Sequence, residues 1–239
     1  MTSAGPKVKI CGVTRLEDAR LAADLGAWSV GMVFHEESPR RCSIAEARRI
    51  TAALRRRTAL CGVFVNASLE ELAEVVRELD LALVQLHGDE GPSFCAEAGR
   101  RTGARVIKAL QVSAGGDVED AERFRVDFHL LDARSSTPQK RALRGGTGET
   151  FDWSLLAARR SSVPLILSGG LSPQNVGAGI AAARAHGLFA VDTASGTEAA
   201  PGRKDPERLR AFFAAVEAAG EVAREAGGPD TAAAVESAA

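Results

Sequence analysis

The sequence lacks an excess of charge of either sign, and it lacks long hydrophobic runs. Thirty lysines and arginines are matched by thirty-one aspartates and glutamates, for a formal net charge of −1. Such a balance does not favour a nucleic-acid or anionic-membrane surface. No apolar stretch approaches the roughly 20 residues of a membrane span, and residues 1–6 are short and polar. We therefore expect a soluble, unexported protein whose partner is a small molecule, with no nucleic acid and no membrane.

Cysteine is scarce as well. The four cysteines, Cys11, Cys42, Cys61 and Cys95, are scattered, with no C-x-x-C pair and no histidine at metal-ligand spacing. This pattern indicates neither a disulfide framework nor a zinc site, so no metal is expected. A reducing cytoplasm fits such cysteine usage best.

Short apolar runs rich in Val, Ile, Leu and Phe recur along the 239 residues, separated by stretches whose apolar residues fall at helical spacing. This alternation is typical of βαβ units with parallel strands. It predicts strands at 7–11, 28–34, 59–65, 82–86, 105–110, 128–132, 164–168 and 189–192. It predicts helices at 16–25, 44–56, 69–79, 91–102, 118–124, 153–160, 173–185 and 206–218. The fifth of these, 118–124, has little room because Gly115 and Gly116 precede it.

Eight strand-helix pairs fit a closed (β/α)8 TIM barrel, an α/β fold, formed as a single domain by residues 1–219. An open doubly wound sheet shows the same alternation, and periodicity alone does not separate the two. Residues 220–239 are Ala-rich with a Gly227-Gly228-Pro229 break, and we expect a flexible carboxyl-terminal extension that frays or forms a loose helix.

In such a barrel the active site lies at the carboxyl ends of the strands. Cys11 ends the first expected strand, where a thiol can act as a base or nucleophile if its pKa is lowered. Asp132 ends the sixth, where a carboxyl group can act as a general acid. Each has a structural alternative, a buried apolar cysteine and a capping aspartate. Their shared position at the barrel mouth favours a catalytic pair.

Three further features follow strands. The Arg40 guanidinium can hold a planar carboxylate by a bidentate fork. His87 can contact substrate or transfer protons, although a structural histidine is an equal alternative. The Gly-rich segment 145–148, which contains Gly146 and Thr147, can close over a substrate, although glycines mostly mark turns.

Two loops follow the last two strands, the positions that build a phosphate site in many such barrels. The first contains Gly169 and Gly170, and the second contains Ser195 and Gly196. Backbone N–H groups at a helix start bind phosphate. We expect these four residues to bind phosphate, with tight strand-to-helix turns as the alternative.

Taken together, these residues resemble the phosphoribosylanthranilate isomerase family of tryptophan biosynthesis. The resemblance runs from Lys7 to about Ala218, in the family's motif order. The matching segments are KICGVT (9–14), GVFVN (62–66), QLHG (85–88), LD (131–132), GGTGETFDW (145–153), LSGGL (167–171) with Asn175, VDTASGTE (191–198) and PGRKD (201–205).

The resemblance implies a (β/α)8 barrel and an aldose-ketose isomerase. The implied reaction is the Amadori rearrangement of N-(5-phospho-β-D-ribosyl)anthranilate to 1-(2-carboxyphenylamino)-1-deoxy-D-ribulose 5-phosphate, with no cofactor. Cys11 matches the family's general base, Asp132 its general acid, and Arg40 the residue that binds the anthranilate carboxylate. Both a monomer and a homodimer stay open.

The sequence departs from the family pattern at three places. Ala194 stands where a serine is usual, Thr193 replaces an apolar residue, and Arg41-Cys42 replaces an aromatic or aliphatic pair. Ala194 weakens at most one side-chain contact to phosphate. Two alternatives remain. One is the related histidine-pathway isomerase, or a barrel that catalyses both reactions; these enzymes resemble this chain but use an Asp where it has Cys11. The other is a catalytically silent barrel that only binds a ligand.

Overall fold

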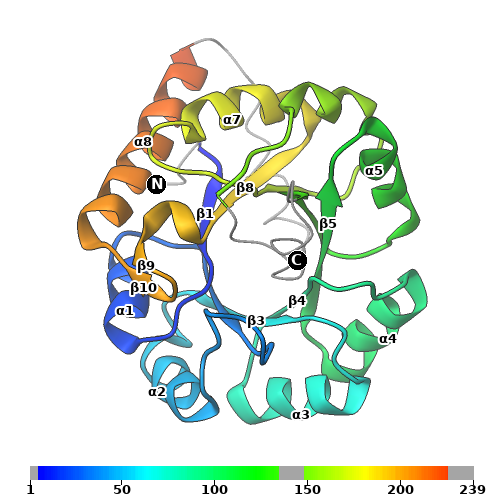
Figure 1. Ribbon diagram of the computed structural model, residues 1–239, viewed down its shortest axis with the longest axis vertical. Helices are drawn as coiled ribbons and strands as arrows, with labels where there is room; N and C mark the ends of the chain where they lie inside the picture. Colours follow the sequence, from blue (N-terminus) through cyan, green and yellow to red (C-terminus); the bar gives the residue numbers. More distant parts are fainter. Residues whose placement is uncertain (1–4, 135–147, 226–239) are drawn as a thin grey trace.

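The computed structural model describes residues 5–134 and 148–225. Its eight long strands form one closed barrel of parallel strands in sequence order (Figure 1). The strands are β1 (Lys7–Ile10), β2 (Ser29–Val33), β3 (Ala59–Phe64), β4 (Leu83–Leu86), β5 (Arg105–Val112), β6 (Phe128–Ala133), β7 (Leu165–Leu167) and β8 (Leu188–Thr193). The expected (β/α)8 barrel is confirmed, and the closed ring excludes the open doubly wound sheet.

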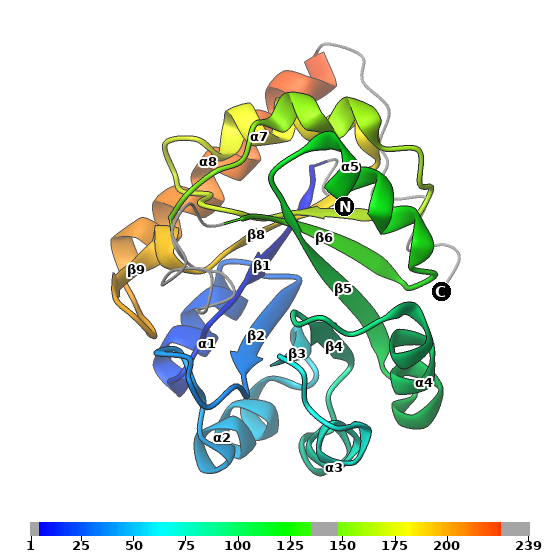
Figure 2. The same cartoon turned by 45° about the vertical axis from the view of Figure 1, so that its right-hand side comes forward.

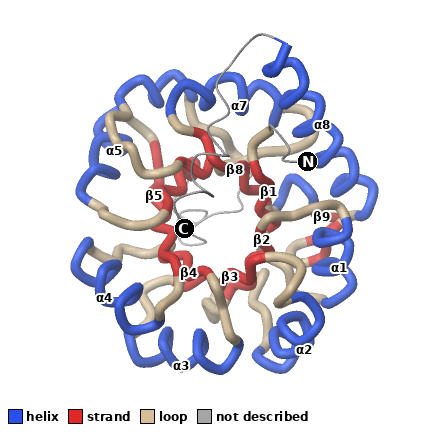
Figure 3. The backbone as a smooth tube through the Cα atoms, turned by 180° about the vertical axis from the view of Figure 1, so that it is seen from behind, coloured by secondary structure: helices blue, strands red, loops and turns tan. Residues whose placement is uncertain are grey.

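Helices form an outer ring around the strands (Figure 3). They are α1 (Leu16–Asp24), α2 (Ile44–Leu54), α3 (Leu69–Leu79), α4 (Pro92–Thr102), α5 (Gly115–Glu119), α7 (Val176–Ala183) and α8 (Pro206–Glu225). Short 3₁₀ helices are η1 (Asp120–Arg123), η2 (Trp153–Ala158), η3 (Arg184–His186) and η4 (Ser195–Thr197), and a hairpin of β9 (Glu198–Ala200) and β10 (Arg203–Lys204) precedes α8. Among the described helices, none has the length and apolar character to cross a membrane.

Local capping explains where several helices begin. Before α3, the Ser68 hydroxyl accepts from the Glu71 backbone N–H at 3.2 Å, and the Glu71 carboxylate accepts from the Ser68 N–H at 3.0 Å. This reciprocal pair satisfies two amides that a helix start leaves unpaired. Pro92 occupies the first turn of α4, where a missing N–H costs nothing.

Three expected helices differ from those observed. The fifth begins at Gly115 because the Asp117 carboxylate accepts the N–H groups of Ser113 and Ala114 and closes the first turn. The sixth is the 3₁₀ helix η2 rather than an α-helix. The seventh begins at Val176 rather than at residue 173, because the preceding residues form a turn that Asn175 holds.

The last helix is longer than expected. α8 continues through Gly220 to Glu225, and α7 and α8 lie side by side along the outside of the barrel (Figure 2). The carboxyl-terminal extension therefore begins as helix, and the rest of it, residues 226–239, lies outside the described residues.

The amino end of the barrel interior is filled by aromatic side chains. Trp28 meets Phe128 and Phe189 edge-on, with ring centroids 5.3 and 5.0 Å apart. Phe128 and Phe189 lie 5.0 Å apart, and the Arg105 guanidinium lies 4.5 Å from the Phe128 centroid. These contacts close that end of the barrel as a packed core.

Candidate active site

An open cavity of about 690 Å³ lies at the carboxyl ends of the strands. Its lining includes seven of the residues expected from the sequence, Cys11, Arg40, His87, Asp132, Gly169, Gly170 and Ser195. Gly196 lies next to this set rather than on the wall, and Gly146 and Thr147 lie outside the described residues.

Cys11 follows β1 and sits above Lys9, since alternate residues of a strand share a face. Both are buried, and Gly31 on the neighbouring strand β2 leaves them room. A Cβ on Gly31 would lie 3.0 Å from Cys11 Sγ and 3.3 Å from Lys9 Nζ. The thiol and the ammonium therefore share one small space at the cavity floor.

Lys9 is held by a buried ion pair. Its Nζ donates to Asp192 Oδ1 on β8 at 2.8 Å, and the Ser168 hydroxyl donates to Asp192 Oδ2 at 3.1 Å. Burial by itself lowers the pKa of a lysine, but the adjacent Asp192 carboxylate, together with Cys11 and Cys61, outweighs it and raises the pKa of Lys9. Lys9 is therefore a permanent positive charge below Cys11.

Burial raises the pKa of the Cys11 thiol above its ordinary value. The positive charges of Lys9 and Lys204 act in the opposite direction, while Asp192 adds to the increase. The thiolate thus depends on the two lysines, because it has little water to stabilise it.

Asp132 enters the cavity from the end of β6. Its Oδ1 accepts from the Ala133 N–H at 3.0 Å. Its Oδ2 lies 3.3 Å from His87 Nε2, within ion-pair distance, although no described residue makes an aligned hydrogen bond to that nitrogen. The other ring nitrogen, Nδ1, lies 2.8 Å from the Gln85 amide nitrogen. His87 therefore sits between Gln85 and Asp132, partners that the sequence did not reveal.

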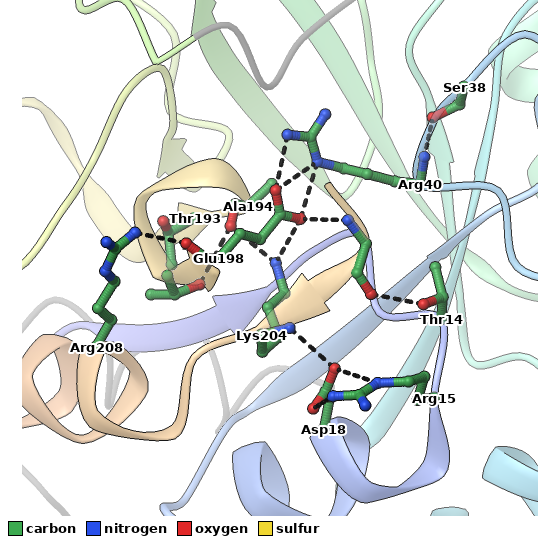
Figure 4. A network of polar contacts seen from close by, with 12 residues as sticks. Thr14, Arg15, Asp18, Ser38, Arg40, Thr193, Ala194, Glu198, Lys204 and Arg208 are labelled. Atoms are coloured by element: carbon green, nitrogen blue, oxygen red, sulfur yellow. Dashed lines mark hydrogen bonds and ion pairs between the residues drawn. The ribbon is translucent and has the colours of Figure 1, made fainter. Parts of the chain in front are cut away.

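Arg40 lies over the opposite part of the mouth, after β2. Its methylenes pass above Gly12, where a Cβ would lie 2.7 Å from Arg40 Cδ. Its Nε and Nη2 donate to Glu198, at 2.9 Å to Oε1 and 2.8 Å to Oε2. Glu198 Oε1 also lies 3.2 Å from Lys204 Nζ (Figure 4). The Arg40 side chain is thus fixed both at its methylenes and at its guanidinium group.

The two expected phosphate loops lie side by side at the mouth, after the neighbouring strands β7 and β8. Gly169 and Gly170 have φ values of +89° and +58°, the left-handed region that glycine adopts without strain. The Asn175 side chain holds this loop, accepting from the Ser172 N–H at 2.8 Å and donating to Gly170 O at 3.0 Å. Gly196 lies so close to the Leu171 carbonyl that a Cβ would be 2.0 Å away. The glycines let the two loops pack closely while their backbones face the cavity.

The sequence analysis assigned no role to the charged residues behind the site. Lys9 is one of two lysines that alternate with apolar residues in β1, and Asp192 lies near the carboxyl end of β8, which is the signal already used for Asp132. Glu198 and Lys204 face each other across the β9–β10 hairpin, where they are register partners. The Pro201-Gly202 turn between them is the feature that predicts this pairing.

Comparisons with known proteins agree with this geometry. The family model described as N-(5'phosphoribosyl)anthranilate (PRA) isomerase matches residues 8–215. A relative named N-(5'-phosphoribosyl)anthranilate isomerase, from Geobacter metallireducens, is 42% identical over 207 residues, covering 87% of this chain and 96% of the relative.

Solved structures give the same result. The phosphoribosyl anthranilate isomerase of Thermus thermophilus superposes with a TM-score of 0.78 at 36% identity, covering 89% of this chain and 98% of that one. An isomerase in complex with reduced 1-(o-carboxyphenylamino)-1-deoxyribulose 5-phosphate superposes with a TM-score of 0.74 at 38% identity, covering 89% and 99%. With its whole barrel matched by model, relative and structure alike, this chain belongs to the N-(5'-phosphoribosyl)anthranilate isomerase family.

Proposed function

We propose that this chain catalyses the Amadori rearrangement of N-(5-phosphoribosyl)anthranilate to 1-(2-carboxyphenylamino)-1-deoxyribulose 5-phosphate, the isomerase step of tryptophan biosynthesis. The observation that carries the proposal is a single cavity lined by both Cys11 and Asp132, in a chain of this family. The substrate is a small phosphorylated sugar amine, and no nucleic-acid or membrane partner is required. The cytoplasm is the proposed location.

In the first step, Asp132 acts as the general acid. It gives a proton to the furanose ring oxygen as the bond from C1 to that oxygen breaks, and the amine lone pair forms a C1–N double bond. The product of this step is an open-chain Schiff base with a positive nitrogen. His87, 3.3 Å from the Asp132 carboxylate, orients the acid and stabilises it once it is ionised.

In the second step, Cys11 acts as the general base. Its thiolate takes the proton from C2, and the electron pair moves into a C1–C2 double bond while the nitrogen becomes neutral. The enolamine then tautomerises to the ketone by moving the proton of its C2 hydroxyl to C1. No redox or metal chemistry enters these steps, because the substrate nitrogen accepts the electrons.

Two groups would hold the ends of the substrate. The loops of Gly169, Gly170 and Ser195, with Gly196 behind them, would bind the phosphate through backbone N–H groups. Arg40 would bind the anthranilate carboxylate by its guanidinium fork. Holding both ends fixes the sugar between base and acid, which is the main benefit of orientation in such a site.

The test is an assay of the purified protein with freshly generated phosphoribosylanthranilate in EDTA-containing buffer, following the loss of anthranilate-type fluorescence. The histidine-pathway substrate is assayed in parallel, and Asp132→Asn serves as the matched inactive control. Loss of the first signal alone supports a dedicated isomerase. Turnover of both substrates would favour a bifunctional barrel, and turnover of neither would favour a silent binding barrel.

A further inference from the structure

Behind Arg40 lies a buried group of three charges, which we call the Arg40–Glu198–Lys204 trio. The Glu198 carboxylate receives the Nε and Nη2 edge of Arg40 and lies 3.2 Å from Lys204 Nζ (Figure 4). The side chains of Glu198 and Lys204 are 4% and 0% exposed. Removing one partner from an ion pair this deeply buried is strongly destabilising, because it leaves the other charge without a partner and without solvent.

The charges of the trio have a consequence for ligand binding. Glu198 alone would cancel the charge of Arg40 and repel an approaching carboxylate. Burial lowers the pKa of Lys204 below its ordinary value, although the Glu198 carboxylate opposes that decrease. With Lys204 protonated, the trio has a net charge of +1 next to the cavity. Burial raises the pKa of Glu198, but the hydrogen bonds from Arg40 and the charge of Lys204 outweigh it and lower that pKa, so the carboxylate is ionised.

The edge of Arg40 that Glu198 occupies is also informative. A guanidinium presents its donors in a planar fork, and a carboxylate on the Nε and Nη2 edge fixes the plane of that fork. The other edge of the guanidinium, formed by Nη1 and the second N–H of Nη2, then has a fixed orientation. Because Arg40 lines the cavity, a fixed fork can receive a planar carboxylate with little loss of side-chain entropy.

Glu198 is in turn rigidly anchored. Its carboxylate accepts from the Gly202 N–H at 3.2 Å, and its backbone carbonyl accepts from Arg208 at 2.5 Å. The Thr14 hydroxyl donates to the Gly202 carbonyl at 2.5 Å, which ties the hairpin to the loop after Cys11. Lys204 Nζ donates to Ala194 O at 2.8 Å, at the cavity wall. The anchor therefore connects the loops after β1, β2 and β8.

We propose that Glu198 and Lys204 are positioning residues for Arg40: Glu198 aims the guanidinium, and Lys204 preserves the positive charge with which Arg40 binds the carboxylate of the substrate. This inference rests on the proposed function, in which Arg40 holds the anthranilate carboxylate.

The test uses two ligands that differ by one group. The first is the reduced product analogue 1-(2-carboxyphenylamino)-1-deoxyribulose 5-phosphate, and the second is its phenylamino counterpart without the carboxylate. Both Kd values are measured by titration calorimetry at constant ionic strength. The Kd of the ligand without the carboxylate, divided by the Kd of the ligand with it, gives a ratio that reports the carboxylate contact alone. Because binding is measured rather than turnover, any effect of Lys204 on the Cys11 thiol does not enter.

The central variant is the double substitution Glu198→Gln with Lys204→Met, which removes one charge of each sign and leaves the net charge of the site at +1. We expect the preference for the carboxylate-bearing ligand to fall about tenfold or more, and we expect the same of Arg40→Met. In the triple variant that adds Arg40→Met, the ratio should fall no further than in Arg40→Met, since the pair acts only through Arg40.

A matched control removes another buried ion pair of the barrel, Glu90 with Lys108, whose nitrogen and oxygen are 2.8 Å apart. The double substitution Glu90→Gln with Lys108→Met should leave the ligand ratio unchanged, whatever it does to stability. If the central variant does not fold, Glu198→Asp, which keeps the charge but withdraws it from Nε, takes its place and should also lower the ratio.

Each failure has its own meaning. If Arg40→Met itself keeps the ratio, the assignment of Arg40 in the proposed function is wrong. If Arg40→Met lowers the ratio but the central variant, or Glu198→Asp in its place, keeps it, the positioning role is overturned and the pair is only structural. A ratio in the triple variant well below that of Arg40→Met would also overturn it, because Glu198 or Lys204 would then touch the carboxylate independently.

Discussion

The two ends of the barrel interior are built from opposite kinds of side chain. At the amino end, Trp28, Phe128 and Phe189 pack with ring centroids about 5 Å apart. At the carboxyl end, Cys11 and Asp132 face an open cavity. Strand β6 joins both ends, because alternate residues point inward and four residues span about 13 Å. Strand β6 thus contributes Phe128 to the packed end of the barrel and Asp132 to the cavity.

This contrast leads us to expect stability from the aromatic end and activity from the polar end of the barrel. The aromatic end gains stability from buried area and needs no partner beyond close packing. The polar end contains buried charges that are tolerated only because each has a partner, as Lys9 has Asp192 at 2.8 Å. Changes at the first end should therefore affect folding, and changes at the second should affect catalysis or charge.

The largest expected effect is on turnover. In the proposed mechanism, Cys11→Ala and Asp132→Asn each remove one proton-transfer group, so we expect kcat to fall by about 10³-fold or more. The fold should be kept, because both side chains lie at the open end. Steady-state kinetics together with thermal unfolding checks this. Full activity of Cys11→Ala would show that another group is the base.

Lys9→Met tests the polar end of the barrel at the buried residue below Cys11. It leaves the buried Asp192 carboxylate without its cation, and we expect the free energy of unfolding to fall by about 3–5 kcal/mol. Loss of the positive charge should also raise the pKa of the Cys11 thiol further, which moves the rise of kcat/KM to higher pH.

The double variant Lys9→Met with Asp192→Asn separates these two effects. It removes the unpaired charge, so chemical denaturation should show that much of the stability returns. The pH profile should then report the thiol without the charges of Lys9 and Asp192, while Lys204 remains. A pH profile of Lys9→Met that matches the original enzyme would mean that Lys9 serves stability alone.

Phe128→Leu tests the aromatic end. It removes the edge-on contact with Trp28 and the ring below Arg105 while keeping an apolar side chain, so we expect a loss of about 1–2 kcal/mol. kcat of the folded enzyme should not change, because Asp132 lies four residues further along β6. A large loss of kcat at unchanged stability would contradict the separation of the two ends.

The sequence was sufficient to predict the parts of the molecule that repeat. All eight barrel strands could be predicted because each is a short apolar run. The position of Cys11 and Asp132 at the barrel mouth could be predicted because they end such runs. The 3₁₀ form of η2 could not, since a helical period does not distinguish it from an α-helix over six residues. The partner of Lys9 could not either, because Asp192 lies 183 residues away and only barrel closure brings them together.

The loops at the mouth fall between these cases. The Glu198–Lys204 pair follows from a short hairpin around a Pro-Gly turn, so the signal was present in the sequence although no role was drawn from it. The contact of Glu198 with Arg40 was not predictable, because 158 residues separate them. The roles of Gly146 and Thr147 stay a prediction.

The smallest expected effect lies on the outer face of β6, one residue from Phe128. His129 Nε2 donates to the Phe124 carbonyl at 2.8 Å, while no described residue hydrogen-bonds to its buried Nδ1. Burial lowers the pKa of His129 below its ordinary value of 6.5, and the charge of Arg159 acts in the same direction, although the contact with the Phe124 carbonyl and the charge of Glu122 oppose them.

The sign of the resulting pH dependence follows by linkage. Between the folded-state and unfolded-state pKa values the unfolded chain binds more protons, so the free energy of unfolding falls as the pH drops through about 6.5. Urea unfolding between about pH 5 and 7 should show this slope in the original protein and a shallower one in His129→Gln. Since His129 points away from the cavity, the pH profile of kcat should be the same in both proteins. If instead His129→Gln shifts that profile and leaves the stability slope intact, then the outer face of β6 contributes to catalysis, and the division between a packing region and a catalytic end does not hold for this strand.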